Sequence, residues 1–132
     1  MRVQARYALP LIVAIAVSGC SPATTPLPDG IAERTPLASC GELVVHLGET
    51  IPIEPRVCLR NAATRAGAEL IVTTSTTEGD PIRRFYRVGP QIDGVEVIVD
   101  NSGDRFGSGG WTTNSCPGAV TVTEYGTCPD AK

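Results

Sequence analysis

Three strand-like segments follow one another in residues 68–99, which read AELIVTTSTTEGDPIRRFYRVGPQIDGVEVIV. Residues 68–77 and 82–88 are rich in β-branched and aromatic side chains, and residues 95–99 carry a valine at every second position. The intervening EGDP and GPQIDG segments contain the glycine, proline and aspartate typical of turns. The stretch therefore predicts a meander of three antiparallel strands.

Two further strand-like segments flank this meander, at residues 42–47 (ELVVHL) and 119–125 (AVTVTEY). Between the first of them and the meander, residues 54–67 (EPRVCLRNAATRAG) predict a helix, because Pro55 suits the first helical turn and Gly67 suits the position just past the end. We therefore expect an α+β fold: a small antiparallel sheet of about five strands with one helix packed on it. A β-sandwich is the alternative, since the helix is less strongly indicated than the strands.

The chain begins like an exported protein. Arg2 and Arg6 precede a run of apolar residues at positions 8–17, interrupted by one proline, and no acidic residue occurs before position 20. A bilayer-spanning helix needs about 20 apolar residues, so this run is too short to cross a membrane. Its length and its basic start are typical of a signal peptide.

The end of this segment, Val17-Ser18-Gly19-Cys20, resembles the lipobox of bacterial lipoproteins. The resemblance implies that residues 1–19 are removed and that Cys20 receives a diacylglyceryl group. Two acyl chains are sufficient for stable anchoring. We therefore expect a protein of the bacterial cell envelope, held by Cys20 on the extracytoplasmic side of a membrane. A plain secretory peptide with a chance cysteine is the alternative.

Residues 20–39 hold Cys20 and a segment with four prolines and no apolar periodicity, which predicts a tether. Extended at about 3.1 Å per residue, it would reach roughly 60 Å. Residues 40–132 would then form one small globular domain.

All 14 acidic residues but only nine of the 11 basic ones follow Cys20, so the chain after Cys20 has a formal charge of −5. Such a charge argues against nucleic acid as a partner.

Four cysteines remain in the domain: Cys40, Cys58, Cys116 and Cys128. An even number in an exported chain predicts two disulfides, and the wide spacing disfavours a zinc site. Three connectivities are possible. If the first and last predicted strands pair antiparallel, Cys40 meets Cys128 and Cys58 joins Cys116, which is the pairing we expect.

Two motifs in the domain occur in a fixed order. Thr76-Thr77-Glu78-Gly79-Asp80-Pro81 is followed by a D-x-x-x-D-x-F-G loop that runs from Asp100 to Gly107. Across about residues 68–110 this pattern resembles small uncharacterised bacterial lipoproteins with a TTEGDP hairpin turn. The resemblance implies an envelope lipoprotein with one recurrent small domain, and no activity comes with it.

Several residues are candidates for chemistry, each with a simpler explanation. Asp100, Ser102 and Asp104 alternate like the start of an EF-hand loop, but Arg105 and Trp111 occupy positions where that loop needs glycine and glutamate. A calcium site of another type is one possibility, and a hydrogen-bonded polar turn is the favoured one.

Catalysis is less well indicated. Glu78 and Asp80 are a pair of carboxylates such as hydrolases use, but a hairpin turn explains them. The single histidine, His46, has no serine, acid or free cysteine at a suggestive spacing. The glycine-rich stretch before Trp111 contains no phosphate-binding motif. We therefore expect no catalytic residues, no metal site and no cofactor.

A binding role has better candidates. Arg83, Arg84 and Arg87 lie on one predicted strand, where Arg83 and Arg87 share a face and Arg84 lies on the other. Charge pairing with Glu96 and Asp100 on the next strand is the simple explanation. The functional one is a site for an anionic or carboxylate-bearing partner, because the planar guanidinium binds carboxylates in two places at once.

Trp111, beside the glycine-rich loop, either covers the core or serves as a binding anchor. We expect an envelope lipoprotein with a non-enzymatic binding or structural role and an envelope protein or anionic ligand as its partner. The alternatives are a small extracytoplasmic enzyme, such as a hydrolase, and a calcium-binding domain built on Asp100 and Asp104.

Overall fold

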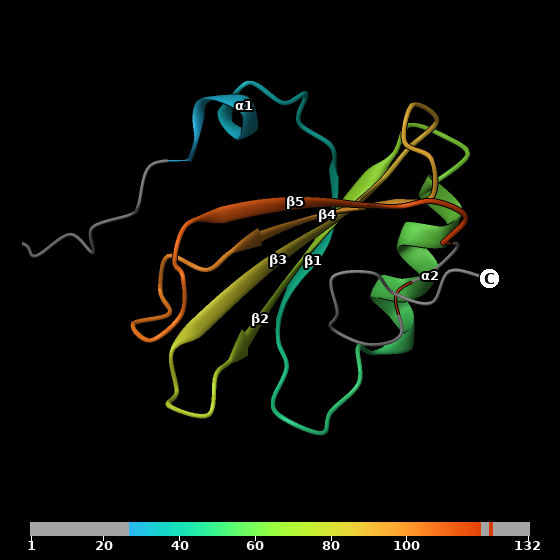
Figure 1. Cartoon of the computed structure of the whole chain (residues 1–132). Coiled ribbons are helices and arrows are strands. Elements are labelled where there is room, and N and C mark those ends of the chain that lie inside the picture. Colours follow the sequence, from blue (N-terminus) through green and yellow to red (C-terminus); the bar gives the residue numbers. More distant parts are fainter. Residues whose placement is uncertain (1–26, 120–121, 123–132) are drawn as a thin grey trace, which may run out of the picture.

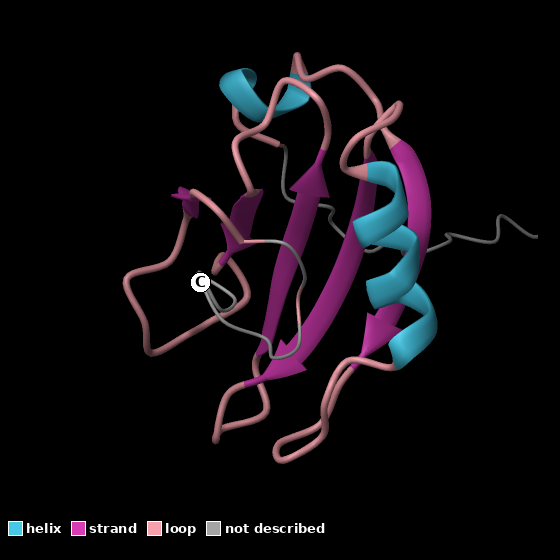
Figure 2. Ribbon diagram, turned by 90° about the vertical axis from the view of Figure 1, so that its right-hand side faces the viewer, coloured by secondary structure: helices cyan, strands magenta, loops and turns pink. Residues whose placement is uncertain are grey.

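The computed structural model describes residues 27–119 and residue 122 (Figure 1). Its elements, in chain order, are α1 (Asp29–Ala32), β1 (Ala38–Val44), α2 (Ile53–Ala62), β2 (Ala68–Ser75), β3 (Pro81–Val88), β4 (Val95–Asp100) and β5 (Trp111–Cys116). The five strands form one sheet in the order β1-β2-β3-β4-β5, and α2 packs on one face of it (Figure 2). The predicted α+β class is confirmed.

The sheet is mixed rather than antiparallel. β2, β3, β4 and β5 follow one another as antiparallel neighbours, which confirms the predicted meander. β1 instead pairs parallel with β2, with Leu43 opposite Val72. The reason is the helix between them: a crossover through α2 returns the chain to the end of the sheet from which β1 started, so β2 runs in the same direction.

The alternation of β2 and β4 gives the sheet one buried face. Leu70, Val72, Val95 and Val97 are fully buried on the side of the helix, together with Tyr86 of β3. Leu59 of α2 and Ile51, just before the helix, complete this core. We call the opposite side of the sheet, which α2 does not cover, the open face.

The boundaries of the outer elements differ from the predicted ones. The first strand is Ala38–Val44 rather than residues 42–47, and a register shift between Ser39 and Glu42 interrupts its pairing. The helix ends at Ala62, and Gly67 serves the turn after it: its φ is 79°, and a Cβ there would lie 2.6 Å from the Val88 carbonyl oxygen.

The fifth strand was not foreseen. It is Trp111–Cys116, which reads WTTNSC. It lacks apolar alternation because it is an edge strand and most of its side chains are exposed or half-buried. Of the predicted strand at 119–125, Ala119 and Val122 are buried, and the other residues lie outside the described part of the chain.

The structure joins Cys40 of β1 to Cys58 of α2, with 5.7 Å between their Cα atoms. The expected pairing of Cys40 with Cys128 and of Cys58 with Cys116 is therefore wrong. Its premise fails because β1 and the last described strand, β5, lie at opposite edges of the sheet. One disulfide is seen among the described residues where two were expected in the domain, and Cys128 lies outside them.

Non-reducing peptide mapping should recover a Cys40–Cys58 peptide pair. Cys116 is disulfide-bonded as well, so we expect the same digest to link it to Cys128, because Cys20 is expected to carry lipid. Replacing both Cys40 and Cys58 with alanine should lower the free energy of unfolding by about 3 kcal/mol, the usual effect of opening a loop of this length. A peptide linking Cys58 to Cys116 would contradict the fold.

Candidate functional site

Strand alternation places Arg83, Phe85 and Arg87 on the open face, as the sequence predicts. Their cross-strand neighbours on β4 are Asp100, Ile98 and Glu96. Arg84 points to the other side, where its Nη1 donates to Thr74 Oγ1 at 2.7 Å. Two of the three arginines singled out in the sequence therefore share a surface, and the third does not.

Arg87 is the centre of the open face although it is only 7% exposed. Its Nε lies 3.1 Å from Glu69 Oε2 on β2, and its Nη1 lies 3.1 Å from Glu96 Oε2 on β4. The predicted pairing of Arg87 with Glu96 is thus confirmed. Its Nη2 donates to the carbonyl oxygen of Thr35 at 2.9 Å, which brings in a segment 52 residues earlier in the chain.

That segment, residues 27–37, lies across the open face, and we call it the strap. It contains α1, a single turn in which the Ile31 and Ala32 amides donate to the Pro28 carbonyl oxygen at 2.8 and 2.9 Å. Arg34 binds Glu96 through both terminal nitrogens, at 3.0 Å to Oε2 and 3.2 Å to Oε1. Residues that the composition assigns to the tether therefore contact the sheet directly.

We call Arg34, Glu69, Arg87 and Glu96 the clamp. Two guanidinium groups and two carboxylates alternate in it, so its formal charge is zero. All four side chains are at least partly shielded: those of Arg34, Glu69 and Glu96 are 19%, 28% and 25% exposed. Charge-assisted hydrogen bonds in such a setting hold position more firmly than pairs in open solvent.

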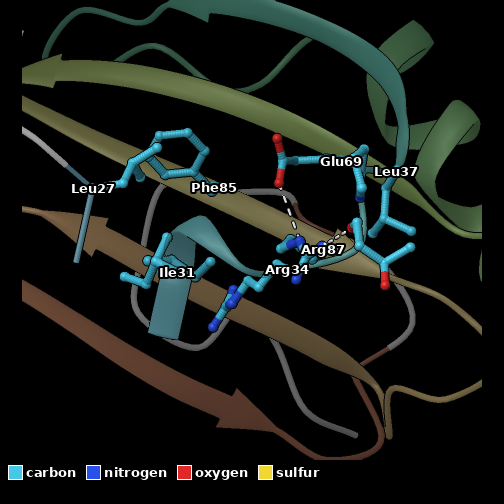
Figure 3. A pocket seen from close by; sticks show the side chains of 10 residues that line it. Leu27, Ile31, Arg34, Leu37, Glu69, Phe85 and Arg87 are labelled. Carbon is cyan, nitrogen blue, oxygen red and sulfur yellow. Dashed lines mark hydrogen bonds and ion pairs between the residues drawn. The ribbon is translucent and has the colours of Figure 1, made fainter. Parts of the chain in front are cut away.

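Apolar contacts accompany the clamp. Leu27, Ile31 and Leu37 of the strap line a hollow of about 220 Å³ together with Phe85 (Figure 3). Ile98 lines the same hollow. Ile98 is only 2% exposed although it faces the side of the sheet without α2. A second hollow, of about 320 Å³, is lined by Thr35 of the strap and by the turn between β3 and β4.

Beside the strap, three side chains form what we call the aromatic platform: Arg83, Trp111 and Phe85, the last of which also lines the first hollow. The Phe85 and Trp111 ring centroids are 5.8 Å apart, and the Arg83 guanidinium lies 5.2 Å from the Phe85 centroid. Arg83 also pairs with Glu42 at 3.4 Å, and both side chains are well exposed, at 39% and 62%. Trp111 is half-buried, and its indole Nε1 has no hydrogen-bond partner among the residues that the structure describes.

The two sequence motifs meet in space. Asp80, from the hairpin turn, is 6% exposed and accepts from Arg105 Nε at 2.8 Å and from the Arg105 amide at 3.1 Å. A Cβ on Gly103 would lie 2.7 Å from the Pro81 carbonyl oxygen, so the loop packs closely on the turn. These motif residues serve the architecture of one end of the sheet.

The remaining candidates are used within loops or are exposed in them, although Asp100 lies opposite Arg83 at the end of β4. Asp104 Oδ1 accepts the Phe106 and Gly107 amides, and Asp100 Oδ1 accepts the Ser102 amide, so both carboxylates organise the loop. His46 is exposed in the loop after β1.

Within residues 27–119 and at 122, no three acidic, histidine or cysteine side chains gather as a metal-binding group. No helix in the same part of the chain is long and apolar enough to cross a membrane.

The strap residues are what the sequence alone did not reveal. Arg34 is an isolated base in a proline-rich segment, and its partner Glu96 lies 62 residues away. A weak signal exists in the spacing of Leu27, Ile31 and Arg34, which would share one side of a helical turn. Four prolines in the surrounding segment outweigh it.

No protein-family model, curated protein or solved structure matches this chain.

Replacing Arg87 with alanine should lower the free energy of unfolding by about 3 kcal/mol, because Glu69 then loses its cation and Glu96 keeps only Arg34. Arg83→Ala is the matched control on the same strand, and we expect it to cost at most about 1 kcal/mol because its ion pair is exposed. Urea denaturation measures both. Equal effects of the two substitutions would contradict the central role of Arg87.

Proposed function

We propose that the protein is a lipid-anchored component of the bacterial envelope whose open face binds a carboxylate-bearing partner without catalysis. The observation that carries the binding part is the aromatic platform. One exposed arginine and two aromatic rings gather on the side of the sheet that α2 leaves free. Such combinations are enriched where proteins bind one another.

Arg83 is the cation suited to this role. The charge of Arg87 is already matched by Glu69 and Glu96, whereas Arg83 has a single exposed partner, Glu42. A carboxylate from another molecule can replace Glu42 at little cost, because exposed ion pairs contribute little to stability. The flat ring of Phe85 beneath the guanidinium keeps it oriented toward solvent.

The anchor rests on the sequence, through the lipobox-like Val17-Ser18-Gly19-Cys20 at the end of an export signal. The non-enzymatic role rests on the same source, since the single histidine has no suggestive partner there. The exposed position of His46 and the use of Asp100 and Asp104 within their own loop agree with this reading.

Replacing Cys20 with alanine should abolish incorporation of labelled palmitate in a bacterial host and move the protein from the membrane fraction to the soluble one. Ser21→Ala is the matched control, because it changes the neighbouring residue and leaves the cysteine in place. Unchanged membrane association of the Cys20→Ala protein would contradict the lipid anchor. This test is independent of any partner.

The binding surface is tested by photo-crosslinking in living cells with benzoylphenylalanine in place of Thr113, an exposed residue opposite Ile98. We expect a discrete crosslinked species that is lost with Arg83→Glu and retained with Arg60→Glu, which reverses an exposed charge on α2. Purified complexes should then weaken as salt increases, because a carboxylate–arginine contact is screened. Loss of the crosslink with both variants, or with neither, would contradict a site at Arg83.

A further inference from the structure

We propose that the strap binds the open face reversibly. While it is docked, the strap covers part of the open face and holds that face close to the membrane in which Cys20 is anchored. The inference rests on the proposed lipidation of Cys20 and adds a second conformation and a membrane-proximal location for the partner. The structural basis is that the strap, which follows the proposed anchor in the chain, is bound across the candidate site.

Docking uses three kinds of contact at separate points of the strap. Arg34 binds both oxygens of Glu96, and the Thr35 carbonyl oxygen accepts from Arg87. Leu27 and Ile31, in the earlier part of the strap, line one hollow with Phe85 (Figure 3) and with Ile98. Three independent contacts fix the direction of a chain segment as well as its position, so the strap enters the sheet along a defined path.

The position of Leu27 limits the distance to the membrane. Only seven residue steps separate it from Cys20, and at most about 3.6 Å per residue they span about 25 Å. The tether predicted from composition could reach roughly 60 Å, because all of residues 21–39 would extend. A docked strap therefore more than halves the greatest distance between lipid and domain, and a partner of the open face must lie near the bilayer surface.

The contacts also allow release. Arg34 is half-buried, and Glu96 keeps its bond to Arg87 when Arg34 leaves for water, so neither carboxylate of the clamp is left without a cation. Strap residues line hollows of about 220 and 320 Å³, so space remains between the strap and the parts of the domain beside it. A partner that binds the uncovered Phe85 and Ile98 more tightly than the strap does would shift the population toward release.

Hydrogen exchange of the full chain, purified from bacterial membranes, tests the docking itself. The Ile31 and Ala32 amides should exchange about tenfold faster in Arg34→Ala than in the unchanged protein, while amides of β2–β4 stay the same. Glu33→Ala is the matched control, an exposed charge on the same strap that should change nothing. If residues 27–37 of the unchanged protein exchange at the rate of a free peptide, docking of the strap is overturned, whatever the state of Cys20.

Energy transfer from tryptophan to labelled lipid tests how far the domain lies from the membrane. Trp111 is the single tryptophan of the chain and lies on the open face, so it serves as donor to dansyl-labelled headgroups in phosphatidylcholine vesicles. We expect Arg34→Ala to reduce transfer at least about twofold, because the freed strap lets the domain move outward. Glu33→Ala should transfer like the unchanged protein.

The outcomes separate the two proposals. Equal transfer from Arg34→Ala and the unchanged protein, with both bound to vesicles, would overturn the role of the strap in limiting reach. A chain that carries no lipid and does not bind vesicles would overturn the lipid anchor instead, and hydrogen exchange would still decide whether the strap is docked.

Discussion

A buried guanidinium on an otherwise open sheet face is the constraint on which this structure depends. Arg87 cannot lie in the middle of β3, almost fully shielded, unless charge and hydrogen-bond acceptors surround it. Glu69 and Glu96 on the two neighbouring strands supply the charge, and the Thr35 carbonyl oxygen accepts a hydrogen bond from Nη2. The N-terminal strap is therefore part of the solution to the burial of Arg87, and removing it would return this side chain to water.

The two faces of the sheet differ in composition because α2 covers only one of them. Valines and leucines of β2 and β4 meet the helix, and the Cys40–Cys58 disulfide ties α2 to the edge strand β1. The other face carries Ile98 and mostly polar and aromatic side chains, of which the clamp and the aromatic platform are the organised groups. Interaction with another molecule is proposed for this face because the aromatic platform lies on it.

The motif pair that resembles small bacterial lipoproteins has a structural explanation here. Asp80 in the turn before β3 receives two hydrogen bonds from Arg105 in the loop before β5, and Gly103 permits the close approach to Pro81. A pattern of acids and glycines that suggested a metal or a catalytic pair thus joins two loops at one end of the sheet. Its residues lie apart from the clamp.

The sequence by itself determined the meander, the face on which each of its side chains lies and the helix before it, because these follow from local periodicity and turn residues between adjacent segments. It placed Arg83 and Arg87 together and Arg84 apart for the same reason. Only the tertiary structure decided that β1 runs parallel to β2, that WTTNSC is a strand, that Cys40 meets Cys58 and that Arg34 reaches Glu96. In each case the local sequence does not indicate which distant segment becomes the partner. Pairing across a crossover, at a sheet edge or over 62 residues of chain is set by the packing of the whole sheet.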